Sequence, residues 1–180
     1  TALQRFNYTY PEYLNYSQNW VADWGNKTSK VEDFSYFMYG GKNNSIAANS
    51  NMGNYNTSSA TSMSYMFFNN VGDIANCKTK IVNAGQADEY IAWDVKKVEN
   101  FSYMFAGGSG RFVSTEFPDN WYISGNNQDI NMQNMFGWFY GGVSLNNITD
   151  VDSFATKTIS AGTSPYGTQY TAWDMSNTTN

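Results

Sequence analysis

A pattern of apolar and polar positions recurs along the chain. The clearest copy runs from Trp93 to Gly108 and reads W-D-V-K-K-V-E-N-F-S-Y-M-F-A-G-G. Related segments lie at residues 30–41 and 55–68, a more divergent copy ends at Gly142, and a fifth begins at Trp173 and matches only as far as Asn177. A unit of this size cannot bury its own apolar face, so we expect the copies to stack on one another.

The second half of each copy has the spacing of a short helix. Val98, Phe101 and Phe105 stand at i, i+3 and i+7, which is one face of a 3.6-residue period. Gly107 and Gly108 follow at the place where a left-handed residue often ends a helix. The same spacing predicts short helices at residues 31–38 and 60–67.

A run with the alternation of a half-buried strand precedes the helical part, at residues 90–95, 120–123 and 170–175. The predicted fold class is therefore α/β: a leucine-rich-repeat-like solenoid of short strands and short helices, with about three to five irregular coils. Residues 1–20 are predicted to be an N-terminal capping strand or arm, and residues 21–180 the repeat domain.

The predicted core consists of apolar repeat positions that should be buried together: Phe34, Met63, Phe67, Trp93, Val98, Phe101 and Phe105. Trp121 and Trp173 are also expected to be core residues. The segments between copies differ in length, and we expect the insertions at 45–53, 71–88 and 142–170 to lie on one side of the stack. Recognition usually depends on such variable loops.

The pattern W-D-x-x-x-V-x-x-[FM]-S-Y-M-F-x-[GN]-[GN] resembles the repeats of the BspA-like leucine-rich-repeat surface proteins of bacteria. Residues 55–67 and 93–105 match best, and residues 127–130 read N-Q-D-I, a phrase found between copies in that family. The resemblance implies a secreted or surface-attached solenoid, often an adhesin. The insertions here are longer than the family's, the copy at Met132 lacks Ser-Tyr-Met, and no wall-anchor motif or lipobox occurs.

Composition and charge argue against several classes of function. The net charge is −5, with ten basic residues, which argues against nucleic acid as a partner. No run of about 18 apolar residues occurs that would span a membrane. The chain has no His and a single cysteine, Cys77, so it lacks the commonest general base and metal ligand and cannot form an intrachain disulfide. We expect no enzyme activity, no cofactor and no transition metal.

Calcium stays open as a ligand. Asp150 and Asp152, with Asn146 and Asn147, could supply oxygen ligands, although the twelve-residue loop of a typical calcium site is absent.

Aromatic residues are the candidates for a contact or assembly surface, because they combine a large area with a polar group. They are Phe6, Tyr8, Tyr10, Tyr13, Tyr16, Trp138, Tyr166, Tyr170 and Trp173. Among the Asn-x-Ser/Thr triplets, the candidate glycosylation sites are Asn43, Asn56 and Asn147.

Two functions fit these features. The first is a non-enzymatic extracellular or cell-surface protein, an adhesion or recognition module that presents variable loops to another protein or a glycan. The second is a structural subunit that assembles head-to-tail into an extracellular filament or sheath. In that assembly residues 6–16 would cover an apolar edge formed by Tyr170, Ala172 and Trp173 in the next copy. The start at Thr1 suits either a processed product or a fragment.

Overall fold

A computed structural model describes residues 24–37, 50–68, 75–106, 118–123, 129–135 and 156–178. These parts contain the 3-10 helices η1 (Gly25–Thr28), η3 (Ser50–Asn54) and η4 (Ala75–Cys77). They also contain the strands β1 (Lys80–Val82), β2 (Tyr90–Ala92), β3 (Lys157–Ile159) and β4 (Tyr170–Ala172). Strand β1 pairs with β2, and β3 with β4, both antiparallel.

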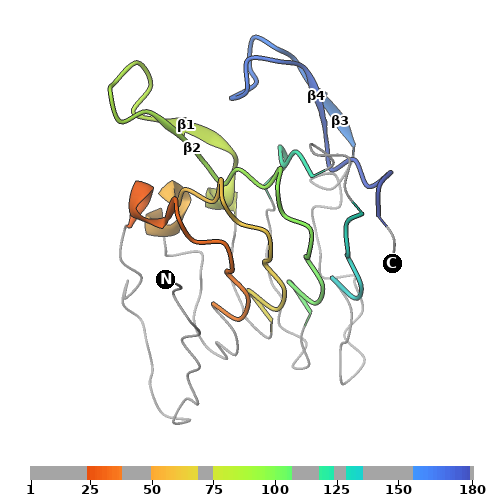
Figure 1. The fold of residues 1–180 in the computed structure, drawn as a ribbon. Helices are drawn as coiled ribbons and strands as arrows, with labels where there is room; N and C mark the ends of the chain where they lie inside the picture. The colour runs from red at the N-terminus through yellow and green to blue at the C-terminus, as the bar shows by residue number, and fades with distance from the viewer. Residues whose placement is uncertain are drawn as a thin grey trace.

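The copies of the motif lie side by side in chain order (Figure 1). Isolated parallel bridges join Asp33 to Ser62, Ser62 to Asn100, and Asn100 to Asn131. In each step a backbone N–H donates to the C=O of the next copy: Phe34 to Ser62 at 2.9 Å, Met63 to Asn100 at 2.9 Å, and Phe101 to Asn131 at 2.8 Å. Met132 thus occupies in the fourth copy the place that Phe101 has in the third.

The same local bend follows each bridge. The side-chain oxygens of Asp33, Asn100 and Asn131 each accept a hydrogen bond from the backbone N–H two residues later, at 2.8–3.0 Å. This Asx turn is a local alternative to helical hydrogen bonding. The next residue takes a left-handed conformation in every copy: φ is 62° at Tyr36, 57° at Tyr65, 56° at Tyr103 and 51° at Asn134.

The predicted helices at 31–38, 60–67 and 98–105 are wrong: the described residues of these segments form bridges and turns. Phe101, Tyr103 and Phe105 donate their N–H groups to Asn131, Gln133 and Met135 of the next copy, at 2.8–3.0 Å. A helix would use those groups within the copy. The spacing of Val98, Phe101 and Phe105 therefore reflects side chains that point inward from a bent, extended segment.

Two of the three predicted strands are present in shortened form. They are β2 and β4, and each ends at a Trp in the left-handed conformation, with φ 50° at Trp93 and 52° at Trp173. Residues 120–123 form no strand. There the side chain of Asn120 takes the place of a strand partner: its Oδ1 accepts from Thr79 N–H at 3.0 Å and its Nδ2 donates to Thr79 C=O at 2.8 Å.

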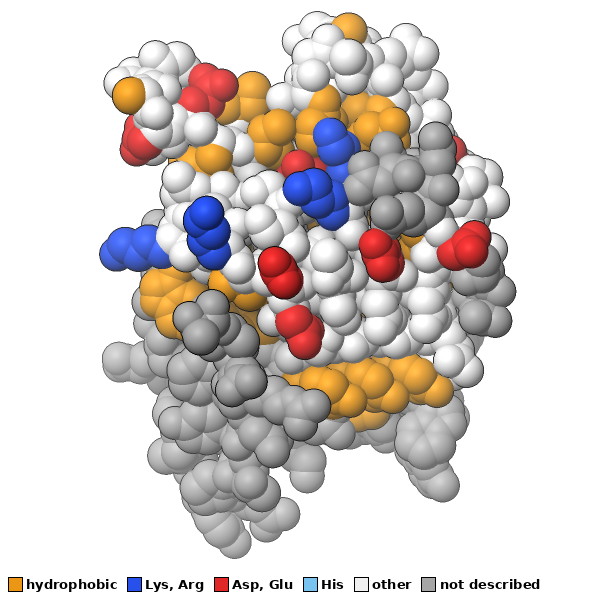
Figure 2. Space-filling view, viewed as in Figure 1, with side chains coloured by type: hydrophobic (Ala, Val, Ile, Leu, Met, Phe, Trp, Pro, Cys, Tyr) orange, Lys and Arg blue, Asp and Glu red, His pale blue; other side chains and the backbone are white. Residues whose placement is uncertain are grey.

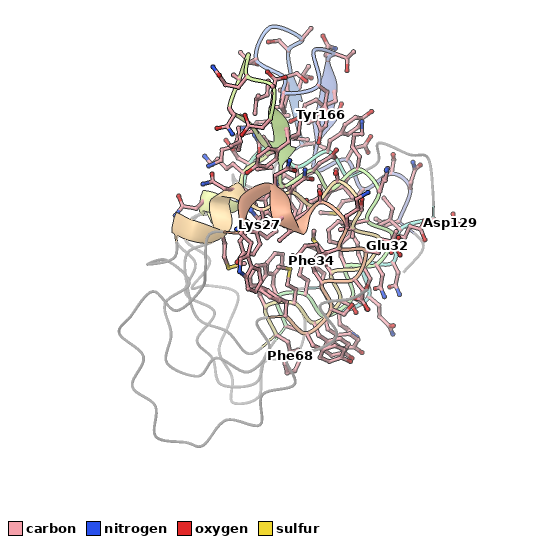
Figure 3. The ribbon with its side chains drawn as sticks, turned by 60° about the vertical axis from the view of Figure 1, so that its left-hand side comes forward. Lys27, Glu32, Phe34, Phe68, Asp129 and Tyr166 are labelled. Carbon is pink, nitrogen blue, oxygen red and sulfur yellow. The ribbon has the colours of Figure 1, made fainter. Side chains whose placement is uncertain are left out.

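The predicted core is confirmed, since all seven residues are buried in one cluster. Trp93, Trp121 and Trp173 are buried as well and form a column: Trp93 stacks on Trp121 at 5.9 Å and Trp121 on Trp173 at 5.3 Å between ring centroids. Each indole N–H donates to a backbone C=O, at 2.7–2.8 Å, so the buried polar atom is satisfied. Figure 3 shows Phe34 among the packed side chains of this interior.

Candidate recognition face

The two hairpins project from one edge of the stack, and the space-filling view shows them as separate projections (Figures 1 and 2). Hairpin β1–β2 carries the loop 83–89 and hairpin β3–β4 the loop 160–169. The first loop lies mostly within the predicted insertion at 71–88 and the second within that at 142–170, and the two hairpins lie on the same side of the stack (Figure 1). We call this side the hairpin face.

The two hairpins share a sequence pattern that lies outside the repeated motif. The first strand of each lies in a segment of the same pattern, T-K-x-[VI]-x-A-G, from Thr79 to Gly85 and from Thr156 to Gly162. The second strand of each leads into Y-x-A-W-D, ending at Asp94 and Asp174. The hairpin is therefore itself a repeated element. Aligning the two insertions with one another would have revealed it.

Among the residues that the structure describes, the first loop is held by contacts of its own. Residues 83–89 are all exposed. Asn83 Nδ2 donates to Asp88 Oδ2 at 2.7 Å, and Gly85 N–H donates to Glu89 Oε2 at 2.5 Å. Gly85 has φ 75°, which favours glycine at this turn. The result is a small, solvated loop with two carboxylates.

The second loop is anchored to the stack through Tyr166. The Tyr166 hydroxyl donates to Asp94 Oδ1 at 2.9 Å, and Lys96 Nζ lies 4.6 Å from the centroid of the Tyr166 ring. The ring also packs edge-on against Tyr122 at 5.7 Å and Tyr170 at 5.4 Å, while Tyr122 and Tyr170 stack at 4.7 Å. We call Tyr122, Tyr166 and Tyr170 the tyrosine clamp. Figure 3 labels Tyr166 at the hairpin end of the molecule.

Burial and charge keep the hydroxyls of Tyr166 and Tyr170 protonated. Burial raises the pKa of Tyr166 well above its usual range, and the charge and hydrogen bond of Asp94 raise it further. Burial, followed by the charge of Asp119, raises the pKa of Tyr170 to about 12. Tyr170 uses its proton to donate to Asn120 C=O at 2.6 Å. Both phenols act as hydrogen-bond donors near neutral pH rather than as acid–base groups.

Ion pairs join the bases of the two hairpins. Asp119 contacts Lys78, which precedes β1, at 3.4 Å, and it also pairs with Lys157 of β3. Partial burial raises the pKa of Asp119, but the hydrogen bond from Lys157 and the charge of Lys78 outweigh that effect and hold the pKa below its usual value. Because all three side chains are partly exposed, the pairs contribute little to stability.

A second aromatic feature runs along the opposite edge of the stack. Tyr36 stacks on Tyr65 at 4.8 Å and Tyr65 on Tyr103 at 4.7 Å, with interplanar angles of 5° and 9°. Asn134 continues this tyrosine column and donates from Nδ2 to the Tyr103 hydroxyl at 2.9 Å. Figure 2 shows a row of hydrophobic side chains along these turns. Since the ring faces stack on one another, the column presents mainly ring edges to the outside.

Of the predicted contact residues, the structure describes Tyr166, Tyr170 and Trp173. Tyr166 and Tyr170 meet in the tyrosine clamp. The predicted open edge at Tyr170, Ala172 and Trp173 is wrong, because these residues are 4%, 0% and 1% exposed. Strand β3 of the same chain pairs with this edge, and Trp173 lies against Trp121.

The predicted glycosylation of Asn56 conflicts with its surroundings. Asn56 is 6% exposed, and its Nδ2, the atom that would carry a glycan, donates to Asn26 Oδ1 at 2.6 Å. Its Oδ1 accepts from Ser58 N–H at 3.0 Å. Asn56 thus has the role that Asp94 and Asp174 have in their copies, where the carboxylate caps the N–H two residues later.

The other predicted site residues lie outside the described residues. These are the contact residues Phe6, Tyr8, Tyr10, Tyr13, Tyr16 and Trp138, the glycosylation candidates Asn43 and Asn147, and the calcium candidates Asn146, Asp150 and Asp152.

Comparison with known proteins gives no match: no protein-family model, no curated protein and no solved structure matches this chain. The resemblance to the BspA-like surface proteins therefore rests on the motif itself. Within the described ranges, no helix is long and apolar enough to cross a membrane. The same ranges contain no group of three or more His, Cys, Asp or Glu side chains that could hold a metal ion.

Proposed function

We propose that this chain is a non-enzymatic recognition module of the extracellular or cell surface. In this proposal the motif copies form a repeat solenoid, and the hairpin face contacts a partner protein or glycan. One observation carries the proposal: two hairpins of a common pattern project from the same edge of the stack and differ in their loops (Figure 1).

The loops differ in ways that affect recognition. Loop 83–89 carries two carboxylates and, within the described ranges, is hydrogen-bonded to itself, whereas loop 160–169 has no charged residue and is fixed by Tyr166. A rigid scaffold with variable loops is the usual arrangement of binding proteins, because the scaffold pre-orders the loops and lowers the entropy lost on binding. The anchored loop would supply a pre-ordered contact and the acidic loop an adaptable one.

The head-to-tail filament has less support. Its predicted interface was the edge at Tyr170 and Trp173, which β3 and Trp121 cover within the same chain. We therefore base the proposed function on the hairpin face.

A binding screen tests the proposal. Labelled protein is applied to printed glycans and to immobilised extracellular-matrix proteins. Any binding found is then measured for two variants, one with loop 83–89 and one with loop 160–169 replaced by Asn-Gly. We expect at least one replacement to weaken binding by about tenfold or more, since a two-residue turn preserves the hairpin but removes its loop.

The matched control is Asn134→Ala, which changes the opposite end of the molecule and should change binding less than about twofold. Binding that survives both loop replacements, or that is lost in Asn134→Ala alone, would contradict the hairpin face as the contact surface.

A further inference from the structure

Three Asn-x-Ser/Thr triplets lie entirely within the described residues, and they differ in burial. They begin at Asn26, Asn56 and Asn100. Asn56 is buried, Asn100 is half-buried in the ladder that joins the copies, and Asn26 is exposed. A glycan is a bulky, hydrated group that needs a position at the surface. Of the three triplets, the one at Asn26 therefore meets this requirement best.

Hydrogen bonds determine which way the Asn26 amide faces. Ser58 N–H donates to Asn56 Oδ1 at 3.0 Å, so the nitrogen of the Asn56 amide is on the other side and turned toward Asn26. Asn56 Nδ2 then donates to Asn26 Oδ1 at 2.6 Å. Because an amide nitrogen donates and an amide oxygen accepts, the atom of Asn26 that faces Asn56 is the oxygen. The bond between the two side chains therefore does not use Asn26 Nδ2.

This bond is compatible with a glycan on Asn26 but not with one on Asn56. N-glycosylation joins the sugar to the side-chain nitrogen and leaves the amide oxygen in place, so Asn26 Oδ1 can still accept. A glycan on Asn56 would have to extend from a buried nitrogen that already donates to Asn26. The same pair of side chains thus favours modification of one Asn and disfavours modification of the other.

We propose that Asn26 is an N-glycosylation site, an inference that rests on the extracellular location in the proposed function. The donor is a lipid-linked oligosaccharide diphosphate, and an oligosaccharyltransferase catalyses the transfer. A bond forms between Asn26 Nδ2 and the anomeric carbon of the first sugar, while the bond from that carbon to the diphosphate oxygen breaks. The lipid diphosphate leaves, and one amide proton passes to a base of the transferase.

The transfer precedes folding. Thr28, the third residue of the triplet, is 1% exposed, and its hydroxyl bonds to the C=O groups of Gly25 and Asn56 at 2.9 Å. The folded chain therefore does not present this hydroxyl to an enzyme. Before folding, all three triplets are accessible, and the fold then determines which glycan it accommodates. Molecules with a glycan on Asn56 should be missing from the folded protein, because that side chain could not be buried.

The glycan would lie close to the first hairpin. Asn26 belongs to η1, and η1 lies beside β2, below hairpin β1–β2 in Figure 1. A hydrated group at this place would limit the directions from which a partner can approach the hairpin. The modification would thus affect access to the hairpin face without replacing any of its residues.

Secretion from a eukaryotic cell tests the assignment. The full chain is secreted behind a cleavable signal peptide, and the folded protein is isolated by size-exclusion chromatography. Peptide N-glycosidase treatment in heavy-oxygen water then labels each former glycan site for mass spectrometry. We expect the occupancy at Asn26 to be at least about tenfold higher than at Asn56. No glycan at Asn26, or an occupancy there that is no higher than at Asn56, would overturn the assignment.

Two variants separate the site from effects on folding. Asn26→Gln keeps an amide oxygen but removes the triplet, so the label at residue 26 should disappear while the protein is still secreted. Asn56→Asp keeps the oxygen that accepts from Ser58 N–H, as Asp94 does for Lys96 N–H. It should leave the occupancy at Asn26 unchanged. Loss of the Asn26 glycan in Asn56→Asp would overturn the assignment, because the triplet at Asn26 would then not be sufficient.

The outcome can be separated from that of the binding screen. A protein that carries the glycan at Asn26 but binds no partner would contradict the proposed function alone. Loop-dependent binding by a protein that is secreted without this glycan would contradict the glycosylation site alone.

Discussion

The two hairpins have a common pattern, yet one loop is anchored to the stack and the other is not. Loop 160–169 reaches back to the third copy through Tyr166, whose hydroxyl binds Asp94. Loop 83–89 is exposed throughout, and in the part of the chain that the structure describes its hydrogen bonds lie within the loop. The strands and the Trp that follows them are alike, so the difference comes from the loops alone. The order of the loops on the hairpin face therefore depends more on the Tyr166 side chain than on the strand pattern that the two hairpins share.

Removing the side chain of Trp121 should have the largest effect on the free energy of unfolding. Trp121 lies between Trp93 and Trp173, each of which follows one hairpin, and it is fully buried. We expect Trp121→Ala to lower the free energy of unfolding by about 3–5 kcal/mol. Trp121→Phe, which keeps an aromatic ring, should cost clearly less in the same denaturant titration. An equal loss in both variants would show that the column does not depend on ring packing.

Removing the anchor should make the two loops alike. We expect Tyr166→Ala to cost about 2 kcal/mol, from the lost ring contacts and the lost hydrogen bond. It should also raise amide exchange in 160–169 to the level of 83–89, while exchange at 83–89 stays as it is. If the two loops already exchange equally fast in the unmodified protein, the contrast between them is wrong.

The hydroxyl alone is tested by Tyr166→Phe, which preserves the ring. The expected loss is about 1 kcal/mol, because Asp94 loses one hydrogen-bond donor but stays accessible to water. Tyr122→Phe is the matched control within the tyrosine clamp. A larger loss in Tyr122→Phe than in Tyr166→Phe would show that the bond to Asp94 is not what fixes the loop.

The clamp also predicts how stability depends on pH. Folding raises the pKa of two of its phenols, Tyr166 and Tyr170, and the value for Tyr170 is about 12, against 10.0 in the absence of the fold. Their contribution is therefore fully present below pH 10 and is lost as the pH rises toward 12. In denaturant titrations above pH 10, Tyr170→Phe should lose less stability with rising pH than the unmodified protein. Parallel curves for the two proteins would contradict the raised pKa.

The smallest effect is expected at the ion pairs. Asp119→Asn removes the charge that contacts Lys78 and Lys157 at the bases of both hairpins. Because these groups are partly exposed, we expect a loss of about 0.5 kcal/mol that vanishes in 1 M salt. A loss that persists at high salt would mean that Asp119 acts through a contact other than charge.

The sequence predicted which residues are buried better than it predicted the backbone conformation. Phe101 and Phe105 face inward in either a helix or a bent, extended segment, so their burial did not depend on the choice between the two. The helix was wrong because Asn100 caps a turn through its side chain and the N–H groups that follow bond to the next copy. Such bonds depend on the neighbouring copy, which periodicity within one copy does not contain.

The candidate site was predicted only in part. Tyr166 and Tyr170 were named as contact residues, but their meeting with Tyr122 depends on a loop that folds back across the stack. The hairpin strands could have been found from the shared T-K-x-[VI]-x-A-G. The burial of Asn56 could have been found as well, since it stands where other copies have the Asp of W-D. Both signals require aligning the copies with one another.

The direction of the hydrogen bonds between copies has a mechanical consequence. All of them run along the stack, since each joins an N–H of one copy to a C=O of a neighbouring copy. A force that pulls the two ends of the stack apart loads the interfaces in series, so they should open one at a time and extend the chain in steps. A force across the stack loads the bonds of an interface together and should meet greater resistance. The molecule is thus expected to yield along its length and to resist shear across it.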